Sequence, residues 1–182
     1  MPQLPHPDLK WVSSSMHIID KSFIKEPKKY IVQSLVAVAA VALILFFVGI
    51  ITHAAIVAAL GASAFIIFAM PHSVAAQSRR LIGGHIVGVA CGTLCRYALC
   101  TGPLGALAGN WEYMPWLAAA IAVGLSIFLM PITNTEHPPA ASVALGIAIY
   151  PWSYQVVIFV LLFAIGLALI RRVLRGYLRN LY

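Results

Sequence analysis

The chain has 182 residues, of which 62% are hydrophobic and only 9% are charged. A soluble globular domain carries about 25% charged residues, so this composition excludes an ordinary soluble fold. The net charge of +7 suits nucleic acid in a soluble protein. Here the lysines and arginines stand at the ends of apolar segments, where the membrane surface explains them better. We therefore expect one polytopic domain in contact with the lipid bilayer, and no nucleic-acid partner.

The first 30 residues are polar and contain proline, and they lack the short apolar core of a secretory signal. Met16, Ile19, Phe23 and Ile24 recur at helical spacing beside several lysines. This pattern indicates a short amphipathic helix on the membrane surface. A tail without fixed structure is the alternative. In both cases residues 1–30 form a cytoplasmic or interfacial segment.

The apolar segments predict an all-α membrane protein with six transmembrane helices, since about 20 apolar residues cross a hydrocarbon core. They occupy a transmembrane domain at residues 31–171, followed by a basic cytoplasmic tail at 172–182. The predicted spans are 31–51, 54–70, 81–100, 115–130, 138–150 and 151–170.

The basic residues predict the orientation of these spans. They form three clusters: Lys28 and Lys29, then Arg79 and Arg80, then Arg171, Arg172, Arg175 and Arg179. With six spans and both termini in the cytoplasm, all three clusters face the cytoplasm, as the positive-inside rule requires. Five spans would place the C-terminal arginines outside.

A polar break, "NTEHPPAA" at 134–141, separates the fourth and fifth spans. The fifth span is short, so the break must lie at membrane depth and face protein or water. Pro138 and Pro139 suit the first turn of a helix, and Asn134 and Thr135 are predicted to cap it. Two further residues, Glu136 and His137, are costly at this depth and need partners. The candidate partners are His72, Arg79, Arg80, His85 and Arg96.

A second break matches the first one. The segment Phe68-Ala69-Met70-Pro71 recurs as Phe128-Leu129-Met130-Pro131, and both copies end an apolar span and open a polar stretch. Matched breaks in two halves of a chain indicate the binding site of a transporter. The alternative is a chance match, because proline often follows a helix. A helix start at Pro138 favours an anion, although the prolines remove backbone donors.

The third span carries Gly84, Gly88 and Gly92 on one face. Such a row lets helices approach closely, either within one protomer or between subunits of a homo-oligomer, and it could also line a narrow path. Packing is also the expected role of Cys91 and Cys95. The spacing of the histidines and cysteines is irregular, so we expect no metal and no cofactor.

Three stretches of the chain resemble the HPP family of integral membrane proteins, named for His-Pro-Pro. They are Pro71-His72-Ser73-x-Ala75-Ala76-Gln77, Leu81-Ile82-Gly83-Gly84-His85 and Thr133-Asn134-Thr135-Glu136-His137-Pro138-Pro139-Ala140. The resemblance covers about 36–171, and it departs from the family pattern at Ser78, where proline is frequent. Members in cyanobacteria and chloroplasts are associated with nitrite transport, so the resemblance implies a small-anion transporter. Some members carry a regulatory CBS domain, which this sequence does not include.

We therefore expect a transporter or channel for a small inorganic anion, with nitrite as the best single candidate, in a bacterial inner membrane. We expect no enzyme activity. Glu136 would hold an arginine or carry a coupled proton. The predicted substrate-binding residues are His72, Ser73, Gln77, Arg79, His85, Arg96, Asn134, Thr135, Glu136, His137, Pro138 and Pro139.

Two other functions remain open from the residues. A membrane scaffold or assembly subunit is suggested by the glycine row and the small size of the chain. A membrane enzyme would use Ser73 with His72 or His85, and it predicts a hydrogen bond between Ser73 and His85.

Overall fold

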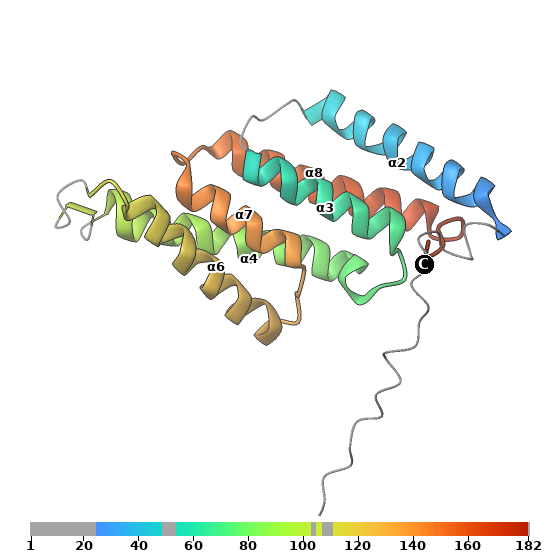
Figure 1. The fold of residues 1–182 in the computed structure, drawn as a ribbon. Coiled ribbons are helices and arrows are strands. Elements are labelled where there is room, and N and C mark those ends of the chain that lie inside the picture. Colours follow the sequence, from blue (N-terminus) through green and yellow to red (C-terminus); the bar gives the residue numbers. More distant parts are fainter. Residues whose placement is uncertain (1–24, 49–53, 103–104, 107–110, 182) are drawn as a thin grey trace, which may run out of the picture.

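Six α-helices form the computed structural model, which describes residues 25–48, 54–102, 105–106 and 111–181 and has no strand among them (Figure 1). One α-helix corresponds to each predicted span, which confirms the all-α fold. The amphipathic helix predicted around Met16 and Phe23 lies outside the described residues. The helices are α2 (Pro27–Val48), α3 (Ala54–Ala69), α4 (Ser78–Arg96), α6 (Met114–Ile132), α7 (Pro138–Ile149) and α8 (Tyr154–Leu174).

Three of the helices are long and apolar enough to cross a membrane: α4 with the π-helical turn η3 (Tyr97–Thr101), α6 and α8. Two shorter apolar helices, α3 and α7, have 16 and 12 residues. At 1.5 Å per residue, α7 is about 18 Å long. The helix at the predicted fifth span is therefore short, as expected.

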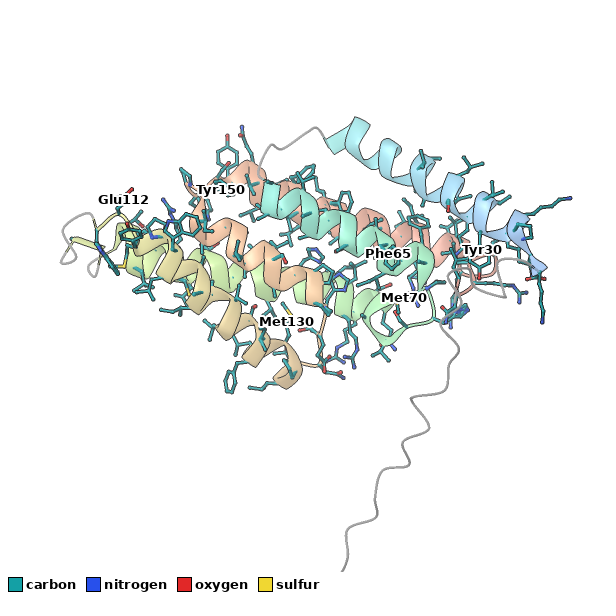
Figure 2. All side chains as sticks on the ribbon, in the orientation of Figure 1. Tyr30, Phe65, Met70, Glu112, Met130 and Tyr150 are labelled. Carbon is teal, nitrogen blue, oxygen red and sulfur yellow. The ribbon has the colours of Figure 1, made fainter. Side chains whose placement is uncertain are left out.

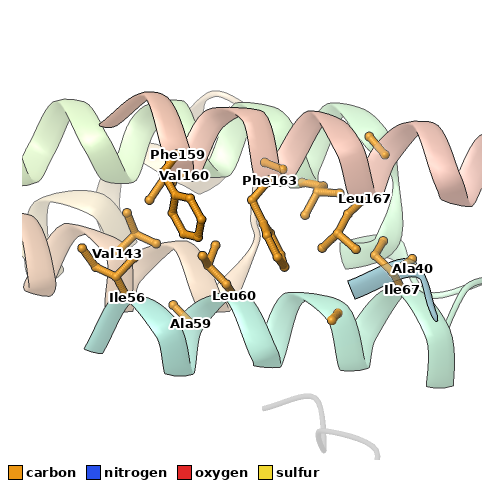
Figure 3. Packing of buried hydrophobic residues seen from close by; sticks show 14 of the residues in the cluster. Ala40, Ile56, Ala59, Leu60, Ile67, Val143, Phe159, Val160, Phe163 and Leu167 are labelled. Atoms are coloured by element: carbon orange, nitrogen blue, oxygen red, sulfur yellow. The ribbon is translucent and has the colours of Figure 1, made fainter. Parts of the chain in front are cut away.

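The helices form two groups, which are joined where α7 packs against α3 and α4 packs against α8. Helices α3 and α8 lie side by side, with α2 on their outer face, whereas α4, α6 and α7 form the other group (Figure 1). Between α3 and α8 the core contains large side chains, among them Ile56, Leu60, Phe159, Phe163 and Leu167 (Figure 3). A second core joins α4, α6 and α7 through smaller residues: Cys91, Cys95, Ala118, Ala119, Ala122, Ala144 and Ala148. The two cysteines are buried packing residues, as predicted.

The glycine row of α4 packs against α7 within the protomer. A Cβ atom added at Gly88 would lie 2.3 Å from the carbonyl oxygen of Ala140, and one at Gly92 would lie 2.7 Å from that of Ala144. At Gly84 it would meet the Cβ atom of His137 at 2.6 Å. Of the alternatives that the sequence left open for this row, the structure shows packing within one protomer, because α7 covers this face. A homo-oligomer through another surface stays a prediction.

The segment after α8 is not a free basic tail. The Gln33 side chain of α2 donates to the carbonyl oxygen of Arg179 at 2.7 Å, and the backbone amide of Leu181 donates to that of Ala69 at 3.0 Å. Leu178 is buried between these contacts. The end of the chain therefore folds back against α2 and the end of α3.

Candidate functional site

The two polar breaks meet inside the bundle. The first lies between α3 and α4 and contains the 3-10 turn η2 (Val74–Ala76), and the second lies between α6 and α7. His137 donates from Nδ1 to the carbonyl oxygen of Ala75 at 3.0 Å, and Arg79 donates to that of Thr133 at 3.3 Å. In Figure 2, Met70 at the start of the first break lies at one end of the bundle, and Glu112 and Tyr150 lie at the other. The predicted pairing of the breaks therefore has a physical basis.

Two fully buried histidines lie at the centre of this junction. The rings of His85 and His137 are 5.1 Å apart and tilted by 41°. The Nδ1 atom of His85 donates to the carbonyl oxygen of Leu81 at 2.8 Å. Both Nε2 atoms face the hydroxyl of Ser63 on α3, at 3.0 Å from His137 and 3.5 Å from His85.

Ser63 was not among the residues that the sequence singled out for the site. It is fully buried, and its Oγ atom also lies 2.9 Å from the carbonyl oxygen of Ala59. A hydroxyl in the middle of an apolar helix near a predicted break was the available signal. The same signal occurs at Ser126 of α6, which is equally buried. Its hydroxyl donates to the carbonyl oxygen of Val123 in its own helix.

The predicted caps of α7 are wrong, whereas the prolines occupy the predicted first turn. His137 is the N-cap residue, and no side chain caps the helix. Asn134 instead ends α6, with a φ of 55° in the left-handed region. The amides of Asn134 and Thr135 donate to the carbonyl oxygens of Pro131 and Met130, a Schellman motif. Helix α6 contains Pro131 and ends at Ile132, two residues beyond the predicted end at 130.

An ion pair braces the second break from outside. Arg80 of α4 donates to the carboxylate of Glu136 and, through its other terminal nitrogen, to the side-chain oxygen of Asn134. The hydroxyls of Thr133 and Thr135 lie 2.7 Å apart beside it. Among the candidate partners, the structure thus pairs Glu136 with Arg80 and His137 with His85.

A polar pocket of about 450 Å³ opens beside the first break. Ser73, whose Oγ atom is buried and has no hydrogen-bond partner among the described residues, lines it. Arg171 donates to the carbonyl oxygen of Pro71 from Nε at 3.1 Å and from Nη2 at 2.7 Å. From the sequence, Arg171 and Arg175 indicated only the orientation of the spans. The pocket is lined by Pro71, His72, Ser73, Gln77, Arg171 and Arg175.

Arg96 lies away from this junction. Its Nη1 atom donates to the carbonyl oxygens of Ala148 and Ile149, at 3.2 and 2.7 Å, at the C-terminal end of α7. His137 stands at the opposite end of that helix, so the length of α7, about 18 Å, separates the two residues. Arg96 is therefore not brought beside Glu136 or His137, for which it was a candidate partner.

The hydrogen bond predicted for a membrane enzyme, between Ser73 and His85, does not form. The ring nitrogens of His85 face Leu81 and Ser63, and Ser73 lines the basic pocket. The serine that approaches both histidines is Ser63. The absence of enzyme activity stays a prediction.

A bundle of apolar helices joined at two polar breaks, with a buried histidine pair between them, defines a polytopic integral membrane protein. The chain belongs to the HPP family, because the model of the HPP transmembrane region matches residues 24–180. This match begins before and ends after the predicted domain limits of 31 and 171.

Two curated transmembrane proteins of Dictyostelium discoideum are similar to the chain. One is 41% identical over 90 residues, and the other is 38% identical over 84 residues. These matches cover 50% and 46% of this chain, but only 28% and 24% of the relatives. No solved structure gives a significant match. Because both relatives come from a eukaryote, a bacterial inner membrane stays a prediction.

Proposed function

We propose that the protein is a transporter or channel that moves a small monovalent anion across the membrane, with nitrite as the best single candidate. The observation that carries this proposal is the arginine-lined polar pocket beside the joined breaks. Its volume of about 450 Å³ is more than sufficient for an ion of a few atoms. Matched helix breaks at membrane depth are typical of transporter substrate sites.

The residues around the pocket suit an anion. Arg171 and Arg175 supply positive charge, and the unpartnered hydroxyl of Ser73 is an available donor. Arginine is a preferred binder of oxyanions because its planar guanidinium presents several donors. The pocket is therefore the first binding position for the anion. The buried histidine pair blocks the path of the anion between the two breaks.

Eight of the twelve predicted substrate-binding residues have one of three roles in this proposal. His72, Ser73 and Gln77 line the pocket. Glu136, Asn134 and Thr135 hold the second break in place through Arg80 and Thr133. His85 and His137 are fully buried, so they contact an anion only if the breaks separate.

Nitrite flux into proteoliposomes tests this proposal, measured as the excess over protein-free liposomes. Arg175→Gln and Ser73→Ala change the pocket, and His137→Ala changes the junction. Arg172→Gln is the matched control, because Arg172 is exposed on the same helix and does not line the pocket. We expect flux in the wild type and the control and reduced flux in the other three variants. No flux in the wild type, or equal flux in all variants, would contradict the proposal.

The same assay with nitrate, formate and bicarbonate establishes which anion is preferred. The pocket contains charge and donors but no arrangement that is specific to one of these ions. We expect nitrite to give the highest flux in a competition between the four. A higher flux for another anion would keep the transport proposal and replace nitrite as its substrate.

A further inference from the structure

Fewer hydrogens than acceptors lie between the two buried histidines. The Nδ1 atoms of His85 and His137 face the carbonyl oxygens of Leu81 and Ala75. A carbonyl oxygen only accepts, so both Nδ1 atoms carry hydrogen. In neutral rings both Nε2 atoms are then acceptors. Three acceptors, these two atoms and the carbonyl oxygen of Ala59, therefore surround the single hydroxyl hydrogen of Ser63.

One added proton turns one of these acceptors into a donor. If the Nε2 atom of His137 is protonated, it donates to the Oγ atom of Ser63 at 3.0 Å. The Ser63 hydroxyl is then free to donate to Ala59 or towards His85. A second proton is excluded, because two imidazolium rings would stand 5.1 Å apart in an apolar interior. The arrangement thus has a place for one proton and not for two.

From this geometry we infer that His85, His137 and Ser63 form a binding site for a single proton, and that this proton moves together with the transported anion. The coupling part of the inference rests on the proposed function. The proton comes from the aqueous phase and returns to it, and no covalent bond between heavy atoms changes.

The charges around the site explain why the proton and the anion would travel together. Helices α3, α6 and α7 and the turn η2 carry no charged residue. On α4, Arg96 is at the far end, Arg79 is exposed, and Arg80 is paired with Glu136, the residue before His137. On α8, the charged residues Arg171 and Arg172 lie at the end beside the polar pocket.

A buried cation in this setting lacks a free counter-ion and is costly. A monovalent anion that enters from the pocket supplies the missing negative charge. The two sites are adjacent in the chain: Ser73 lines the pocket, and Ala75 holds His137. The pair of ions has no net charge, so its passage is electroneutral and does not respond to the membrane potential.

The proton site is tested without transport by nuclear magnetic resonance of isotope-labelled histidines in lipid nanodiscs, titrated from alkaline to acidic pH. We expect the signals of His85 and His137 to change together and to account for one proton. Uptake of two protons, or no uptake by either ring while the protein remains folded, would overturn the site.

The Ser63→Ala variant tests whether the two rings share one proton or titrate independently. Without the hydroxyl, we expect the two rings to lose their common titration step. Ser126→Ala is the matched control, because Ser126 is equally buried but contacts only its own helix, and it should titrate as the wild type does. A wild-type titration in Ser63→Ala would show that the hydroxyl does not join the rings and would overturn the inference.

The coupling is tested in proteoliposomes that report nitrite uptake and internal pH while the potential is clamped. Because nitrous acid crosses bilayers unaided, only the excess over protein-free liposomes counts. We expect one proton per nitrite at every potential, and loss of proton movement in His85→Gln and His137→Gln. Nitrite flux that follows the potential without protons overturns the coupling and leaves anion transport intact. No nitrite flux in the wild type overturns both anion transport and the coupling, and the titration then decides the proton site alone.

Discussion

The side chain of His137 in the second break donates to the backbone of Ala75 in the first, with 3.0 Å between Nδ1 and the carbonyl oxygen. This bond and the contact with Ser63 attach His137 to α3 and to the turn η2 that follows it. A helix N-cap residue usually turns its side chain back to its own helix, and His137 does not. The start of α7 is therefore positioned by α3 and the first break.

The ion pair between Arg80 and Glu136 should contribute modestly to stability. Glu136 is about two-fifths exposed at 41%, and Arg80 is 17% exposed, so solvent screens part of the attraction. We expect a coupling energy of about 1 kcal/mol in a double-mutant cycle of Arg80→Gln and Glu136→Gln. Thermal unfolding of the four proteins in detergent measures it, and raised salt should reduce it.

Arg79→Gln is the control for the ion pair, because Arg79 is exposed and donates only to the carbonyl oxygen of Thr133. Its effect should stay within about 0.5 kcal/mol. A coupling energy indistinguishable from zero would show that Arg80 and Glu136 do not brace the break in solution.

The left-handed backbone at Asn134 predicts a strong dependence on residue type. Its φ of 55° suits asparagine and glycine, whereas a β-branched residue is strained there. Asn134→Val should lower the free energy of unfolding by about 1–2 kcal/mol. Asn134→Gly loses only the contact with Arg80 and should have a smaller effect. Equal melting temperatures for the two variants would mean that the Schellman motif does not limit stability.

The sequence could predict what depends on composition and proline chemistry. Apolar runs of the expected length predicted all six helices within a few residues, and Pro138 and Pro139 marked the start of α7. Asn134 was misassigned because asparagine is favoured both as the N-cap of a helix and as the left-handed residue that ends one. When the helices are five residues apart, only the backbone conformation distinguishes the two roles.

The site itself depended on contacts between distant segments. Ser63 has no polar neighbour in the sequence, and its role appears only when α3 packs beside α4 and α7. Arg96 shows the reverse error, since a charge inside a span attracts a functional interpretation. Only the direction of α7 reveals that Arg96 lies at the end opposite to His137.

Arg96 should therefore matter for stability and not for the transported anion. Its guanidinium donates to the last carbonyl oxygens of α7, where a helix end carries partial negative charge. Arg96→Gln should lower the free energy of unfolding by about 1–2 kcal/mol. Nitrite flux per folded protein should stay at the wild-type level. A folded Arg96→Gln protein without flux would place Arg96 in the transport path and contradict this assignment.

The contact between α4 and α7 should be the least tolerant of added volume. A methyl group at Gly88 would meet the carbonyl oxygen of Ala140 at 2.3 Å, and a backbone atom cannot move aside as a flexible side chain does. Gly88→Ala should therefore lower the free energy of unfolding by about 1–3 kcal/mol, the usual range for overpacking.

Gly124→Ala is the matched control within a helix, because nothing lies within 4 Å of its added Cβ atom. Thermal unfolding in detergent should show no loss in the control, since alanine favours a helix over glycine. A Gly88→Ala protein as stable as Gly124→Ala would mean that α7 does not lie against the glycine row, and the junction at His137 would then need a different arrangement.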